Sequence, residues 1–155
     1  MRPVLSDNNR KRSTAGGEGA ILVELAIVLP LLALMFLTVI DLGLVIWEHQ
    51  VLQNGVREGA RFSTLPMNWI NPRNPGATEN EIRQRVIDYC QDEGITLDPG
   101  NITVDQQFPI DVGGLTVLGS EVTVAYDRTF LVPGAPLLPF PQVRLTGRAV
   151  FRNLY

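Results

Sequence analysis

The feature that most constrains this chain is an apolar run long enough to cross a membrane. Residues 20–47 carry only two charged side chains, Glu24 and Asp41. The steps between them span about 25 Å of helix at about 1.5 Å per residue, close to the hydrocarbon thickness of about 30 Å. The run is apolar on every face, unlike the amphipathic helices on the surface of soluble proteins. We therefore predict one transmembrane helix with its two carboxylates near opposite boundaries of the membrane.

The residues that flank the run predict its orientation. Basic residues precede it, whereas Glu48 and His49 follow it; the basic residues are Arg2, Arg10, Lys11 and Arg12. Positive flanks stay in the cytoplasm, and Trp47 suits the outer interface. A cleaved secretory signal is the lesser alternative, because its apolar core would be about 7–15 residues long and would end in a small-residue cleavage site. We expect a single-pass protein with a cytoplasmic N-terminus and an extracytoplasmic C-terminal domain.

Composition removes several functional classes. The net charge of −3 is too small to indicate nucleic-acid binding. Cys90 is the only cysteine and His49 the only histidine, so neither a disulfide framework nor a zinc site is expected. The sequence has no phosphate-binding loop and no recognisable nucleophile triad. We therefore expect no catalytic residues, no metal, no cofactor and no enzyme activity.

The junction in front of the apolar run is the sharpest functional signal. Glycines at 16, 17 and 19 meet the run at Gly19/Ala20, and Glu24 lies one helical turn inside it. An ionisable group at that depth is costly unless it has a partner, which makes it a functional candidate. A new N-terminus at Ala20 would place an ammonium about one turn away. The alternative is a carboxylate that merely snorkels to the interface.

A resemblance to a known family rests on the segment GAILVELAIVLPLLALMFLTVIDLGLVIWEHQVLQNGVREGAR, residues 19–61. Its V-E-x-A-x-V-L-P core, its late acidic residue and its Q-N-x-x-R-E-G-A-R end resemble the TadE-like pseudopilins of the tight-adherence (Tad/Flp) type IV pilus system. In prepilin-like proteins a membrane-embedded peptidase cuts after a glycine, and a Glu occupies the fifth mature position. Gly19, Ala20 and Glu24 match that pattern. Leu25 departs from it, because an aromatic residue usually follows the Glu, and VIDLG replaces a more common glutamate version.

The resemblance implies a minor pilin or pseudopilin of the bacterial inner membrane that assembles or primes a pilus and serves surface adhesion. Its implied partners are the membrane, prepilin peptidase, other pilins or pseudopilins and pilus-assembly proteins, but no nucleic acid. Candidate helix contacts are Pro30, Asp41, Arg57, Glu58 and Arg61. Pro30 can equally be a simple kink. The alternative function is an unprocessed, single-pass anchor for an extracytoplasmic binding domain. Entry into the fibre versus priming, and a TadE-like versus a TadF-like role, stay open.

The predicted organisation is a cleaved basic leader (1–19), a transmembrane and stem helix (20–63) and an extracytoplasmic domain (64–155). The helix is expected to run from about Leu22 to Ser63. Its stem carries one apolar face at helical spacing, made of Val51, Leu52, Val56 and Ala60. Glu58 and Arg61 are spaced to pair weakly. The R-E-G-A-R segment is predicted either to pack on the domain or to contact neighbouring subunits.

The C-terminal domain is predicted to be α+β. Thr78-x-x-Glu81 is a capping box that opens a short helix ending at Gly94, with apolar positions at Ile82, Val86, Tyr89 and Cys90. Cys90 is expected to be a core residue rather than a reactive thiol. Alternation predicts antiparallel strands near 102–106, 121–130 and 142–152, with a short extra strand near 113–119. Trp69 and Ile70, in the loop 66–76, should pack on the domain. The Pro-rich segment 131–141 should cover the sheet edge by default, or else contact the membrane or a partner.

Overall fold

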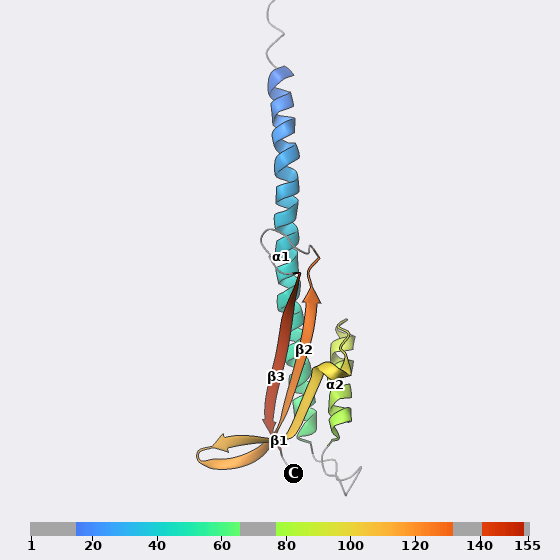
Figure 1. Cartoon of the computed structure of the whole chain (residues 1–155), viewed down its shortest axis with the longest axis vertical. Helices are drawn as coiled ribbons and strands as arrows, with labels where there is room; N and C mark the ends of the chain where they lie inside the picture. Colours follow the sequence, from blue (N-terminus) through green and yellow to red (C-terminus); the bar gives the residue numbers. More distant parts are fainter. Residues whose placement is uncertain (1–14, 66–76, 132–140, 154–155) are drawn as a thin grey trace, which may run out of the picture.

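A computed structural model describes residues 15–65, 77–131 and 141–153. Its elements are α1 (Ala15–Ser63), α2 (Glu79–Asp92), the 3₁₀ turn η1 (Pro99–Asn101), β1 (Ile102–Val112), β2 (Leu115–Thr129) and β3 (Gln142–Arg152). The elements after α1 form the C-terminal domain, which packs along the second half of the long helix (Figure 1). The predicted α+β class, with a long helix, a short helix and a small antiparallel sheet, is confirmed.

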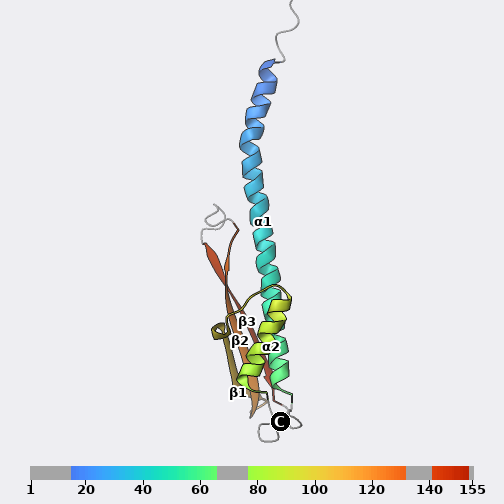
Figure 2. The ribbon, with the colours of Figure 1, turned by 90° about the vertical axis from the view of Figure 1, so that its right-hand side faces the viewer.

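Helix α1 has two unlike halves (Figure 2). Its 49 residues correspond to about 70 Å of helix. The first half stands clear of the domain, whereas the second half packs against α2, β2 and β3. The predicted end at Ser63 is confirmed, but the helix begins at Ala15 rather than near Leu22. Residues 19–63 form the one helix in the described ranges that is long and apolar enough to cross a membrane.

The three strands form an antiparallel sheet in the order β1-β2-β3. Gly113 and Gly114 connect the first two strands and have φ values of 63° and 89°, a conformation that glycine adopts without a steric penalty. The short extra strand expected near 113–119 is not separate. The tight turn at the two glycines leads directly into β2, whose first residues are those of the expected strand. A register shift between Asp105 and Phe108 separates the body of this hairpin from its projecting tip.

The core lies between the helices and one face of the sheet. The predicted stem face is buried, and so are the inward positions of β2 and β3; the main contributors are Leu52, Val56, Ile82, Val86, Cys90, Val122, Val124, Leu145 and Ala149. Glycines let α1 approach α2 closely. A Cβ at Gly59 would lie 2.4 Å from Cγ2 of Val86, and one at Gly55 would lie 2.8 Å from Sγ of Cys90.

Helix α2 begins and ends at the residues that its sequence indicates. Glu81 N–H donates to the Thr78 hydroxyl oxygen, and Thr78 N–H donates to the Glu81 carboxylate, so the capping box is confirmed. The chain leaves the helix through Gly94, whose φ is 80°. Cys90 is confirmed as a core residue, and burial raises the pKa of its thiol to about 11.

Two predicted segments lie outside the described residues. They are 66–76, with Trp69 and Ile70, and 132–140, the greater part of the Pro-rich segment. The predictions of packing for both segments stay predictions.

Candidate functional site

The first half of α1 presents an apolar surface that the rest of the described chain leaves uncovered. Every large apolar side chain from Ile21 to Leu37 is exposed. Burial of apolar surface contributes about 25 cal/mol per Å², so this surface is suited to lipid or to neighbouring helices rather than to water. Pro30 lies on it inside the continuous helix. One shallow hollow on it is lined by Leu32, Met35, Phe36 and Val39.

Gly19, Ala20 and Glu24 lie together at the start of this surface. All three are exposed, and a Cβ at Gly19 would meet no atom within 4 Å. Within the described ranges Glu24 makes no side-chain hydrogen bond and no ion pair; apolar side chains of the same helix, such as Leu25 and Val28, surround it. The carboxylate therefore has apolar neighbours and no partner from this part of its own chain.

Asp41, the other acidic residue of the apolar run, has a different environment. Its side chain is fully buried. Nη2 of Arg128, at the end of β2, lies 3.2 Å from its Oδ1. The backbone N–H of Leu131 donates to both carboxylate oxygens, at 3.1 Å and 3.0 Å. Arg128 also donates through Nη1 to Glu48, two turns further along α1. The C-terminal domain thus supplies the partner that this buried charge requires.

The Asp41–Arg128–Glu48 cluster holds two carboxylates and one guanidinium. Only 11% of the Arg128 side chain is exposed, and 7% of that of Glu48. Charges at this burial need pairing, because removing one partner leaves the other uncompensated. The sequence reasoning missed Arg128, although its signal was present. Arg128 alternates in register with the buried Val122 and Val124, which places an arginine on the inward face of β2.

The stem residues divide between two surfaces. Glu58 accepts hydrogen bonds from Arg85 of α2, with Nη2 at 2.8 Å and Nε at 3.2 Å. The predicted pairing of Glu58 with Arg61 is wrong, because Arg85 reaches the same carboxylate from the packed helix α2. Arg57 and Arg61 are exposed. The glycine and alanine of R-E-G-A-R are buried against the domain, so this segment serves packing within the chain and also presents two arginines outward.

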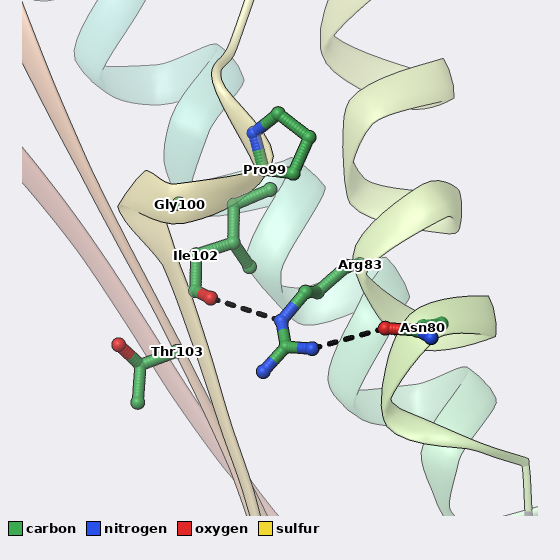
Figure 3. Close-up of a pocket in the computed structure, with 6 residues that line it drawn as sticks. All are labelled: Asn80, Arg83, Pro99, Gly100, Ile102 and Thr103. Carbon is green, nitrogen blue, oxygen red and sulfur yellow. Dashed lines mark hydrogen bonds between the residues drawn. The ribbon is translucent and has the colours of Figure 1, made fainter.

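A second hollow lies between α2 and β1 (Figure 3). Arg83 occupies it, and all three of its guanidinium nitrogens are engaged. Nε donates to the Ile102 carbonyl at 3.2 Å, Nη1 to Asn80 at 3.1 Å and Nη2 to Glu79 at 3.0 Å. Arg83 therefore ties α2 to β1, with three of its five N–H donors used within the chain. In the described ranges, no three His, Cys, Asp or Glu side chains come together as a metal site.

The comparisons with known proteins match the helix that carries Glu24 and Asp41. A family model described as TadE, TadE-like protein, matches residues 19–61. No curated protein and no solved structure matches the chain. The match runs from the first residue of the candidate processing site to the last arginine of the stem. Together with the helix that could span a membrane, it is consistent with a membrane-anchored protein. Over residues 19–61 the chain is therefore similar to TadE-like proteins, which is consistent with a place in Tad pilus systems.

Proposed function

We propose that this chain is a minor pilin or pseudopilin that acts in the assembly or priming of a Tad/Flp-type pilus, and through it in surface adhesion. A prepilin peptidase would remove the basic leader between Gly19 and Ala20. The mature protein would stay in the bacterial inner membrane through α1, with its C-terminal domain on the periplasmic or extracellular side. The chain would work by association with other pilins rather than by catalysis.

The contrast between Glu24 and Asp41 carries this proposal. Both are acidic residues in the apolar segment of α1, where an unpartnered charge is costly. Asp41 receives its partner from its own C-terminal domain. Glu24 receives none from the described part of the chain, which supports a partner from outside it. Cleavage before Ala20 would create an ammonium one turn away, on the same chain or on a packed neighbour.

The backbone around the candidate cleavage site also suits processing. Residues 15–19 are helical and contain three glycines. Each glycine disfavours helix by about 1 kcal/mol relative to alanine, so this turn unwinds more readily than the apolar turns that follow. A peptidase needs an accessible, unwound peptide bond, and the open space around Gly19 leaves room for it.

The processing step is tested by the mass and N-terminal sequence of the full chain, expressed with and without a prepilin peptidase. We expect the mature protein to begin at Ala20 only when the peptidase is present. A Gly19→Leu variant should keep its leader. Gly43→Leu is the matched control, since Gly43 is also exposed on α1 and a Cβ there would meet no atom within 4 Å. An intact Met1 in the presence of active peptidase would contradict the proposal and favour the unprocessed anchor.

The pairing role of Glu24 is tested separately. Glu24→Leu should still insert into the membrane but should lose pilus assembly, because the new ammonium would have no carboxylate to meet. Leu25→Val is the control, because it changes the adjacent exposed position without altering charge. Normal pilus assembly by Glu24→Leu would rule out the pairing role and leave processing to be judged on its own result.

A further inference from the structure

The membrane-proximal edge of the C-terminal domain, defined as Leu131 and Pro141, is held beside α1. Leu131 N–H donates to the Asp41 carboxylate, so Leu131 lies at the level of Asp41 along the helix. Phe130 N–H donates to the Pro141 carbonyl at 3.3 Å, which places Pro141 next to it. Figures 1 and 2 show these ends of β2 and β3 at the end of the domain nearest the free half of α1. Both edge residues are exposed, Leu131 by 60%.

The opposite side of α1 stays apolar beyond Asp41. Ile46 and Trp47 are large, apolar and exposed there. The exposed residues of α1 become polar after Trp47; they are His49, Gln50, Asn54, Arg57 and Arg61. Trp47 is six residues past Asp41, about 9 Å along the helix axis. The apolar surface of α1 therefore continues for about 9 Å along the helix axis past the level at which the edge of the domain begins.

The thickness of a bilayer converts the separation of Asp41 and Trp47 along the helix into a depth of Asp41 in the membrane. Ala20 to Trp47 spans about 40 Å of helix, which equals the thickness of a bilayer including both headgroup regions, about 40–45 Å. Each headgroup region is then roughly 5–8 Å thick. With Trp47 at the outer interface, where tryptophan is favoured, Asp41 and Leu131 lie at the boundary between headgroups and hydrocarbon. Asp41 is tolerated at that depth because Arg128 pairs with it inside the protein.

We propose that the Leu131/Pro141 edge is a second membrane contact of this protein, and that its partner is the phospholipid surface. The inference rests on the placement of α1 across the bilayer that the proposed function includes. An exposed leucine costs free energy in water and gains it among lipid tails. The contact would seat the C-terminal domain on the membrane, rather than letting it stand off on a free stem.

The test uses the full chain in vesicles of phosphatidylethanolamine and phosphatidylglycerol, with Cys90→Ala to leave no native thiol. A polarity-sensitive fluorophore is attached at Leu131→Cys, and nitroxide-labelled lipids serve as quenchers. Leu115→Cys is the matched control, because Leu115 is a 73% exposed leucine at the other end of β2, about 50 Å along the strand at about 3.3 Å per residue. A third label at Leu32→Cys reports on the span of α1 itself.

We expect a blue-shifted emission and strong quenching at position 131, and water-like emission with almost no quenching at position 115. Equal, water-like behaviour at both positions, with position 32 quenched, would overturn the second contact and leave the membrane anchor intact. An unquenched label at position 32 would overturn both the contact and the transmembrane placement on which the proposed function depends.

Discussion

Replacing Arg128 by alanine should strongly destabilise the C-terminal domain. The side chain is 11% exposed, and its partners Asp41 and Glu48 are 0% and 7% exposed. The variant would leave two carboxylates buried with no cation beside them. Breaking a buried ion pair in this way costs about 3–5 kcal/mol, which corresponds to a shift in the unfolding equilibrium of roughly a hundred-fold to a few thousand-fold.

A second ion pair with α1 provides a matched control. Arg85 also pairs with a carboxylate of α1, but its side chain is 52% exposed and that of Glu58 is 32% exposed. Exposed pairs contribute about 0–1 kcal/mol, because water solvates both charges whether or not they meet. Arg85→Ala should therefore lower the free energy of unfolding far less than Arg128→Ala, although both substitutions remove a guanidinium group.

The assay follows the full chain in detergent micelles across a urea series. A brief pulse of thiol reagent labels Cys90 only in molecules whose domain has opened, because the thiol is buried and its pKa is raised to about 11. Mass spectrometry then gives the unfolded fraction at each urea concentration. Equal midpoints for Arg128→Ala and Arg85→Ala would refute the assigned role of the cluster. Removing all three charges, with Arg128→Met, Asp41→Asn and Glu48→Gln, should recover part of the loss, because no charge is then buried without a partner.

Two further predictions use the same urea assay, and a third, at acid pH, follows unfolding by circular dichroism because thiol labelling requires the thiolate. Gly59→Ala should lower the free energy of unfolding by about 1–3 kcal/mol through overpacking, because its Cβ would lie 2.4 Å from Cγ2 of Val86. Gly43→Ala is the control and should cost nothing, because its Cβ would meet no atom within 4 Å. Equal losses of stability in the two variants would refute the packing argument. Thr78→Ala should lower stability by about 1 kcal/mol through loss of the cap, and an unchanged midpoint would contradict that role. Hydrogen bonds from Thr78, first from its backbone N–H, lower the pKa of Glu81 below its ordinary 4.5. The stabilisation from this depressed pKa is therefore complete above about pH 4.5 and is lost as the pH falls through the pKa of Glu81 in the folded chain. Glu81→Ala should remove that part of the acid dependence of stability. An acid unfolding profile identical to that of the unchanged chain would argue against this role of Glu81.

The elements of this fold were predictable because their signals are local. The apolar run predicts α1, and the capping box predicts the first turn of α2. Alternation predicts β3 over Gln142–Arg152, the bounds that the structure has. The predicted bounds of elements were wrong at a tight turn and at a helix end that no local signal marks. The two glycines at 113 and 114 form the turn between β1 and β2, so the residues expected as an extra strand are the beginning of β2. Helix α1 extends back to Ala15 through residues with no periodic pattern.

The candidate site divides in the same way. The candidate processing residues Gly19 and Ala20 lie close to Glu24 in sequence, and the family match covers that stretch. The R-E-G-A-R segment of the stem was harder to interpret from sequence, because its exposed arginines and its buried glycine are close neighbours in the chain. Only the position of α2 showed that Gly59 faces Val86 while Arg57 and Arg61 face outward.

The sequence alone determined that this chain has one long apolar helix, two acidic residues within it and a small α+β domain after it. Hydrophobic periodicity and capping act within a few residues of the chain, and they can be recognised without a fold. The tertiary structure decided which of the two acidic residues already has a partner. Asp41 meets Arg128 across 87 positions of sequence, and that contact exists only because β2 runs back along α1 toward its apolar first half. Glu24 contacts no partner in the described ranges, so only the folded chain distinguishes the carboxylate that the domain pairs from the one that it leaves unpaired there.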